Sequence, residues 1–227
     1  RPLSEMRVID LAIGAGATIG RMLADLGAQV VAGELIRPEL TRERQDRENL
    51  RTTINMLGKK ALTSENDSKS AREQFDTLLA GADLLIIGTA GAVERDLEQL
   101  HRDHPSLVIL SVSDFGFLND LSEWRGSDAV YQALGGHLAR SGVAGRPPLP
   151  APGRIVEQCA MVQACFAALV AYLNRLKTGK GDLLDFATAI GAAQAMDPGF
   201  GMQGSATSGV PASKMPRGRP ANQYLYP

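Results

Sequence analysis

The sequence is poor in aromatic residues, histidine and cysteine, and it carries almost no net charge. Of its 227 residues 5% are aromatic, three are histidine and two are cysteine, and the formal net charge is -1. A balanced charge without a basic stripe lacks the electrostatic footprint that a nucleic-acid partner requires. Cys159 and Cys165 lie six residues apart in an expected helix and so point to different faces, which argues against a CxxC redox pair and a thiolate metal site. We therefore expect a protein of the reducing cytoplasm.

The histidines supply little for catalysis or metal binding. His101 and His104 lie three residues apart before Pro105, at the expected end of a helix, and no third ligand is near them in the sequence. With His137 as the remaining histidine, Ser-His-Asp or Cys-His catalysis is poorly supplied. The sequence therefore predicts no metal site and no such catalytic triad.

One apolar run is near the length of a membrane span. Residues 156–173 read VEQCAMVQACFAALVAYL. In a bilayer, Glu157, Gln158 and Gln163 would lie in or near hydrocarbon, and the run is rich in Ala rather than Leu. These features favour a helix buried in a core or at a subunit interface over a membrane span.

The first 34 residues have the pattern of a strand, a glycine-rich turn, a helix and a second strand. Short runs rich in Val and Ile occupy residues 7–13 and 29–34, and between them lie the turn GAGATIG (14–20) and a helical segment (21–27). This order is typical of a βαβ unit with parallel strands.

Strands and helices continue to alternate after a charged segment, residues 36–49, which is expected to be an exposed loop. We expect further elements at residues 71–79 (helix), 83–87 (strand), 93–101 (helix) and 107–112 (strand). The pattern predicts a doubly wound α/β protein with an open parallel sheet, whose ligands bind beyond the carboxyl ends of the strands.

The last third of the chain is expected to be helical and then irregular. A long helix runs to about residue 177 and ends at the C-cap turn TGKG. Residues 182–196 continue apolar and Ala-rich, and no strand is predicted in them. Residues 191–227 are rich in Gly, Pro and Ser and are interpreted as a linker.

The glycine-rich turn is the first candidate site. It follows a strand and opens a helix, and Glu34 lies 20 positions after Gly14. Such glycines let a backbone approach a pyrophosphate, and the acid can bind a ribose hydroxyl, which suggests NAD or FAD. However, the fingerprint has one extra residue before its third glycine, and similar turns occur wherever a strand and a helix pack tightly. Both interpretations stay open, whereas GKK at 58–60 is expected to be a solvated turn.

Several motifs resemble, in the same order, those of the family III CoA-transferases. Residues 3–31 (LSEMRVIDLAIGAGATIGRMLADLGAQVV) are similar to that family's L-x-G-x-R-V-x-D-L and L-L-A-D-L-G-A-D-V segments. Residues 111–126 (SVSDFGFLNDLSEWRG) resemble its S-x-S-G-F-G stretch. Residues 124–136 (WRGSDAVYQALGG) and 175–187 (RLKTGKGDLLDFA) resemble its P-G-x-D-A-x-x-Q-A-x-G-G and R-x-x-T-G-x-G-Q-x-x-D-x-S segments. The resemblance covers most of residues 3–190.

This resemblance implies a fold, a ligand and a domain arrangement. It implies a Rossmann-like open parallel sheet flanked by helices, truncated relative to the family, with residues 1–190 forming the portion of the large domain. It places Ala15, Gly16 and Ala17 against coenzyme A instead of NAD, with Arg37 and Arg125 as candidate partners of the CoA phosphates.

The resemblance also implies a catalytic carboxylate at the start of the long helix. The family has an Asp 21 residues before the Thr of T-G-x-G, and in this chain that position is Glu157, one methylene longer. A displacement of about 1 Å in a nucleophile can cost on the order of a hundredfold in rate. The family's V-E-N-F-x-P-G is replaced by IIGTAGA, and Ser127 stands where the racemase branch has a His. These departures keep open the interpretation that the chain is a non-catalytic relative of the family.

The implied reaction transfers CoA from an acyl-CoA to a small carboxylic acid through Glu157, without a metal. The alternatives are a non-catalytic half that acts as a binding or dimerisation module, for example a degenerate copy of a fused pair, and an NAD-linked oxidoreductase. Because the long helix is apolar, we expect a homodimer or a partner chain. We expect neither a membrane nor a nucleic acid as partner.

Overall fold

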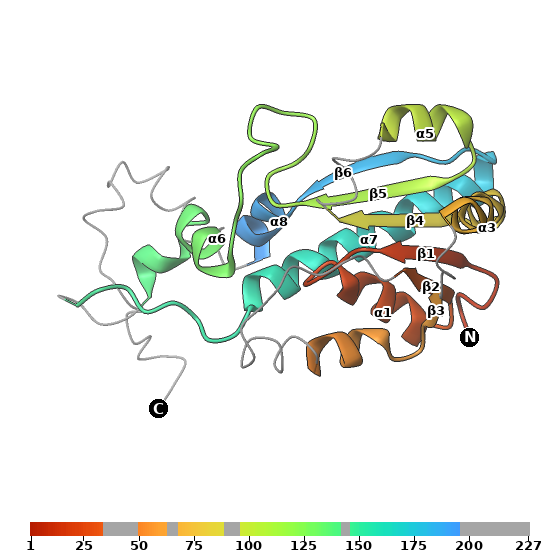
Figure 1. Cartoon of the computed structure of the whole chain (residues 1–227). Helices are drawn as coiled ribbons and strands as arrows, with labels where there is room; N and C mark the ends of the chain where they lie inside the picture. The colour runs from red at the N-terminus through yellow and green to blue at the C-terminus, as the bar shows by residue number, and fades with distance from the viewer. Residues whose placement is uncertain (34–49, 63–67, 89–95, 142–145, 196–227) are drawn as a thin grey trace.

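Figure 1 shows the computed structural model of the chain, which describes residues 1–33, 50–62, 68–88, 96–141 and 146–195. In addition to a helical turn at residues 50–56, its elements are β1 (Arg7–Leu11), α1 (Ala17–Asp25), β2 (Gln29–Gly33), β3 (Lys60–Leu62), α3 (Ser68–Gly81), β4 (Leu84–Gly88), α5 (Leu97–Asp103), β5 (Val108–Ser113), α6 (Asp128–Leu134), a 3₁₀ turn (His137–Arg140), α7 (Ile155–Thr178), β6 (Leu183–Ala187) and α8 (Thr188–Ala195).

Six parallel strands form one open sheet in the order β3-β2-β1-β4-β5-β6. The chain builds outward from β1 to β3, returns to the middle of the sheet at β4, and then builds in the other direction to β6. This order confirms the predicted doubly wound α/β fold. The reversal lies between β1 and β4, so the expected place for a ligand is beyond the carboxyl ends of these central strands.

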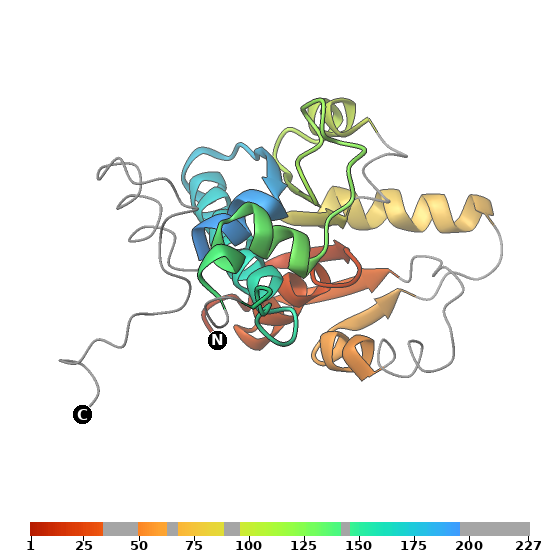
Figure 2. The ribbon, with the colours of Figure 1, turned by 90° about the vertical axis from the view of Figure 1, so that its left-hand side faces the viewer.

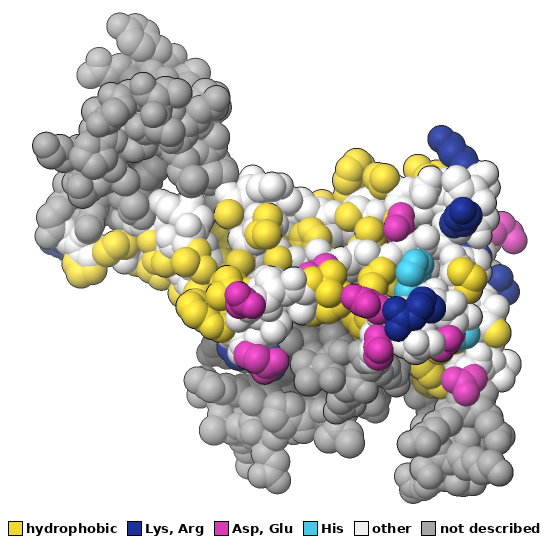
Figure 3. Space-filling model, turned by 90° about the horizontal axis from the view of Figure 1, so that it is seen from above, with side chains coloured by type: hydrophobic (Ala, Val, Ile, Leu, Met, Phe, Trp, Pro, Cys, Tyr) yellow, Lys and Arg dark blue, Asp and Glu magenta, His cyan; other side chains and the backbone are white. Residues whose placement is uncertain are grey.

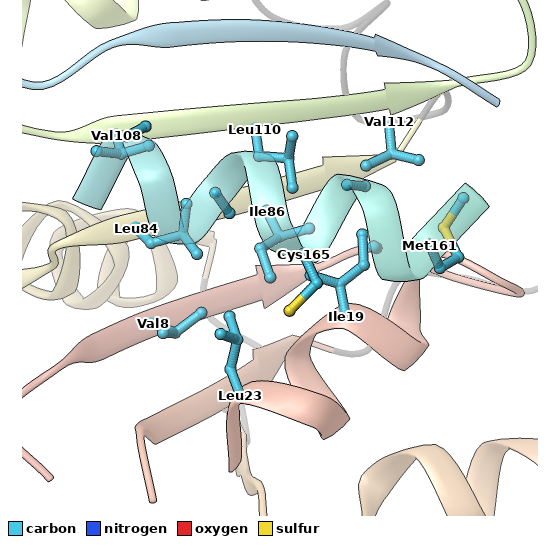
Figure 4. Close-up of a cluster of buried hydrophobic side chains, with 14 of the residues drawn as sticks. Val8, Ile19, Leu23, Leu84, Ile86, Val108, Leu110, Val112, Met161 and Cys165 are labelled. Carbon is cyan, nitrogen blue, oxygen red and sulfur yellow. The ribbon is translucent and has the colours of Figure 1, made fainter. Parts of the chain in front are cut away.

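Helices cover both faces of the sheet, and a separate apolar cluster lies on each face (Figure 2). On one face α1 and α7 pack on alternate strand residues, and Figure 4 shows Ile19 and Leu23 of α1 beside Val8, Ile86 and the other side chains of this cluster. On the opposite face, α3 and α5 pack on the other alternate residues. The central strand β4 is buried at every position, as its uninterrupted apolar sequence predicts.

Helix α7 is the long apolar helix of the sequence, and it lies with one side on the sheet. Ala160, Ala164 and Ala168 are fully buried there, because small side chains let the helix approach closely. It is the one helix in the described ranges that is long and apolar enough to cross a membrane, and half of its most apolar window is buried inside the protein. The opposite side exposes Val162 and Phe166. The expectation of a helix buried in a core therefore holds for its inner face, and the alternative of a subunit interface stays a prediction for its outer face.

The strand β6 is absent from the sequence-based expectations. Its short segment LLDFA has no strong strand pattern of its own, and it is extended because it pairs with β5 from Ile109↔Leu183 to Ser113↔Ala187. The TGKG segment ends α7 and brings the chain close to the start of β5, where this pairing begins. Gly179 adopts a left-handed conformation and ends α7, as predicted, and a Cβ atom on Gly181 would collide with the backbone of Leu107 beside β5.

Candidate active site

Glu157 is the third residue of α7, at the end of the helix that lies beside the carboxyl ends of the strands. The residue is buried, and its side chain is 7% exposed. Both Nε and Nη2 of Arg154, the residue that precedes α7, bind the same carboxylate oxygen, Oε2. The Arg154 side chain is 32% exposed, so it lies on the more accessible side of the carboxylate.

Burial raises the pKa of Glu157, and the neighbouring charges act on it in both directions. The Arg154 guanidinium lowers this pKa through its charge and its hydrogen bond, whereas the negative charges of Asp128 and Asp114 raise it. The net direction is upward. Three carboxyl groups and one guanidinium thus share a small region at the start of α7.

A hydrogen-bond network from α6 fixes the first turn of α7. Asp128 accepts a bond from the backbone N–H of Glu157 (3.1 Å) through Oδ1 and one from Gln132 Nε2 (2.6 Å) through Oδ2. The side-chain amide oxygen of Gln132, Oε1, accepts a hydrogen bond from the backbone N–H of Ala151 (2.8 Å), in the segment that leads into α7. Asp128 therefore satisfies one of the N–H groups that a helix start leaves without a helical partner. Ser127 caps α6.

Asp114, which follows β5, is the centre of a second group of hydrogen bonds. It accepts hydrogen bonds from the Tyr131 hydroxyl (2.7 Å) and from the N–H of Gly126 (2.9 Å). Burial, together with the bond to Asp114, raises the pKa of Tyr131. Phe115 and Trp124 pack edge to face beside this group. The loop 114–126 and α6 are thereby tied together at the carboxyl end of β5.

The glycine-rich turn reaches the same place from β1. Gly14 has a φ of 60°, and a Cβ atom on it would lie 3.9 Å from Nη2 of Arg154. Gly16 is buried and contacts Ala12, while Ala15 and Ala17 are half-buried. The structure thus brings the turn expected to contact CoA next to the Arg154–Glu157 pair.

A buried ion pair lies beneath this turn, which corrects one expectation. Lys59 does not lie in a solvated turn, because its side chain is 1% exposed and its Nζ contacts Asp10 Oδ2 at 2.6 Å. The same Nζ donates to the carbonyl oxygen of Ala17 (2.7 Å), and the other Asp10 oxygen accepts from the N–H of Ala12. Burial raises the pKa of Asp10, and the charge of Lys59 opposes this rise. A Cβ atom on Gly20 would collide with Asp10, so this glycine serves the packing of α1 on β1.

Among the remaining sequence candidates, Arg125 is described and is not part of this cluster. Arg125 is exposed in the loop before α6. Glu34 and Arg37 lie outside the described residues, so their roles stay predictions. Within the ranges that the structure describes, no three His, Cys, Asp or Glu side chains converge so that they could hold a metal ion.

Asp114, Tyr131 and three further residues of the site were not assigned a role from the sequence. Asp128 and Gln132 stand in the quoted D-A-x-x-Q-A segment with the i, i+4 spacing that places them on one helix face, and this spacing was the available signal. Arg154 precedes the long helix three positions before Glu157, but nothing in its sequence context distinguishes it from a surface arginine.

A cavity of about 310 Å³ lies between the loop after β5 and α8. Its lining includes Phe115, Asn119, Gln163, Asp185 and Ile190. Asp185 accepts hydrogen bonds from the N–H groups of the loop. Glu157 is not among the residues that line this cavity.

The comparisons with known proteins agree with this architecture. The model of CoA-transferase family III matches residues 3–226. The chain belongs to this family. It is 37% identical to the probable CoA-transferase Rv1866 of Mycobacterium tuberculosis, over 97% of this chain and 29% of that protein. It is 31% identical to the succinyl-CoA:(R)-benzylsuccinate CoA-transferase subunit BbsE of Thauera aromatica, over 86% of this chain and 50% of that protein.

The solved structures show the same fold. A CAIB/BAIF family protein from Brucella suis matches with a TM-score of 0.76 and 26% identity, over 92% of this chain and 58% of that chain. This family III chain spans about half the length of several curated relatives and a smaller share of the mycobacterial protein, which is correspondingly longer. Members of the family use acyl-CoA substrates, so the CoA interpretation of the glycine turn is favoured over the NAD interpretation.

Proposed function

We propose that this chain carries the nucleophile of a CoA-transferase that moves CoA from an acyl-CoA to a carboxylic acid, and that Glu157 is this nucleophile. The observation that carries the proposal is a buried carboxylate at the N-terminal end of α7, beside the glycine turn that follows β1. The turn supplies close backbone access for CoA. Arg37 and Arg125 are proposed to contact its phosphates.

The proposed reaction has two halves. An oxygen of the Glu157 carboxylate attacks the thioester carbonyl and the C–S bond breaks. CoA departs as a thiolate, and an acyl–glutamyl anhydride is formed. The thiolate then attacks the glutamyl carbonyl, which releases the donor acid and leaves CoA on Glu157 as a thioester. The acceptor carboxylate displaces this CoA and forms a second anhydride, which the thiolate opens to give the new acyl-CoA and free Glu157.

The start of α7 suits these steps because its N–H groups and its dipole favour negative charge. Asp128 holds the backbone of Glu157, and Arg154 holds one of its two carboxylate oxygens. One oxygen is thereby fixed, and the other is left for the attack. We propose that the acceptor is a dicarboxylic acid, since the related enzymes are named for benzylsuccinate and citramalate. We also propose that the protein is located in the cytoplasm and that it forms a dimer.

One observation favours a second candidate, a non-catalytic half of a larger CoA-transferase. The chain has Glu where the family pattern has Asp, and an arginine neutralises it. The longer side chain displaces the attacking oxygen, and pairing with a cation makes this oxygen a weaker nucleophile. The chain would then contribute binding surface and fold while a second copy performs the reaction.

Trapping of covalent CoA separates the two. The protein is incubated with succinyl-CoA, and its intact mass is measured before and after treatment with hydroxylamine. The proposal expects a CoA adduct on the parent that hydroxylamine removes, more adduct on Glu157→Asp, and none on Glu157→Gln. Thermal melting with CoA is the control that each variant still binds its ligand, and NAD serves as the negative control.

An adduct of equal amount on the parent and Glu157→Gln would contradict the role of Glu157. CoA binding without adduct on the parent and on Glu157→Asp would establish the non-catalytic half.

A further inference from the structure

We infer that Arg154 is the binding residue for the carboxylate of the acid substrate, and that it alternates between this carboxylate and Glu157 during the reaction. The inference rests on the proposed function, because it assigns a substrate contact within the same site. Under this inference the Arg154–Glu157 pair opens and closes during the reaction, and it is not only a fixed contact at the helix start.

The geometry places Arg154 between Glu157 and the accessible side of the site. Its guanidinium binds only Oε2 of Glu157, and its side chain is more exposed than the carboxylate that it holds. The same guanidinium faces the glycine turn at Gly14. An acid that reaches Glu157 past this turn therefore meets Arg154 as well.

The charge balance of the reaction requires a new partner for Arg154. In the anhydride, the charge that Glu157 has lost is carried by the CoA thiolate. Once CoA is held on Glu157 as a thioester, Glu157 no longer compensates the guanidinium, and the carboxylate of the departing donor acid or of the arriving acceptor acid carries that charge instead. A guanidinium can bind both oxygens of such a group through two parallel N–H groups, whereas Arg154 holds a single oxygen of Glu157 through Nε and Nη2.

The other carboxylates nearby are already engaged. Asp128 binds the N–H of Glu157 and the amide of Gln132, and Asp114 binds the Tyr131 hydroxyl and the N–H of Gly126. Each uses both of its oxygens in these contacts. In the described part of the chain, Glu157 is the one carboxylate bonded to Arg154. A carboxylate from outside is therefore the partner that fits when Glu157 is neutral.

Equilibrium binding of succinate tests this inference without any turnover. Glu157→Gln is neutral and nearly the same shape, so it imitates the state in which Arg154 has lost its partner. We expect succinate to bind Glu157→Gln at least about tenfold more tightly than the parent in isothermal titration calorimetry, since one charge-assisted contact is gained. Adding Arg154→Gln to Glu157→Gln is expected to remove this gain.

Two controls make the result specific. Glu157→Gln combined with Arg102→Gln, an exposed arginine on α5, should bind succinate as Glu157→Gln does, and succinamide should bind none of the variants. Equal succinate affinity in the parent and Glu157→Gln, including no binding by either, would overturn the inference, as would binding that survives Arg154→Gln. Failure of the proposed function appears separately, as absence of the CoA adduct, and these affinities do not depend on it.

Discussion

At the scale of single residues, Glu157 shows how burial and charge together set the state of a carboxyl group. Its pKa lies above its ordinary value of 4.5 because burial disfavours the charged form, although Arg154 favours that form. The unfolded chain therefore loses its proton at lower pH than the folded protein does. In that window folding is linked to proton uptake, so that the stability contributed by Glu157 declines as the pH rises.

We predict that the parent protein loses stability relative to Glu157→Gln as the pH rises from about 4.5 through the raised pKa. Other titrating groups are common to both proteins and cancel in the comparison. The measurement is the free energy of unfolding in urea at a series of pH values. A difference that stays constant with pH would show that the Arg154 contact cancels the effect of burial, and one that grows in favour of the parent would show that it outweighs burial; either result would contradict the prediction.

At the scale of elements, the pair of Lys59 and Asp10 connects three segments that are distant in the sequence. Asp10 belongs to β1, Lys59 precedes β3, and the lysine also binds the first residue of α1, Ala17. This arrangement fixes the end of β1 against the start of α1, and the glycine turn lies between those two points. The pair therefore acts on the candidate site through the position of the turn.

We predict that Lys59→Met destabilises the protein by about 3–5 kcal/mol, because it leaves the Asp10 carboxylate buried without its counter-charge. The double variant Asp10→Asn/Lys59→Met should recover part of this loss, since no unpaired charge then remains. Chemical unfolding at neutral pH measures both.

The matched control is Arg102→Met, which removes a guanidinium charge from exposed pairs with Asp96 and Glu98. Its expected cost is below about 1 kcal/mol. A cost for Lys59→Met as small as that of Arg102→Met would refute a structural role for the buried pair.

At the scale of the whole molecule, a broad apolar surface is exposed. Val162, Phe166, Val170 and Leu173 follow one another along the outer side of α7, and Phe166 is 68% exposed. On another face, hydrophobic side chains gather toward α6, whereas charged groups gather toward α5 (Figure 3). Contiguous apolar surface on a soluble protein usually marks a contact with another chain or another part of the same chain.

We predict that the chain associates at micromolar concentration and that Phe166→Glu weakens this association, because the charge would be buried in the contact. Light scattering coupled to size-exclusion chromatography measures the mass of each protein. Leu57→Glu, an exposed apolar position outside α7, is the control and should leave the mass unchanged. A parent that is monomeric under these conditions would contradict the prediction.

The sequence alone determined the class of fold and the identity of the candidate nucleophile. Runs such as the buried β4 segment have a hydrophobic pattern that is intrinsic to the chain, so their strands were predictable. The left-handed turn at Gly179, which ends α7, depends on local backbone chemistry, which is also contained in a short segment.

The tertiary structure decided which residues surround Glu157 and which segments join the sheet edges. Strand β6 forms because β5 offers it hydrogen-bond partners, and its own five residues do not dictate an extended conformation. Lys59 is buried because Asp10, 49 positions away, compensates its charge. Asp128 reaches the backbone of Glu157 across 29 positions. Contacts of this kind depend on how the elements pack, because charge pairing and burial act between neighbours in space and not between neighbours in the sequence.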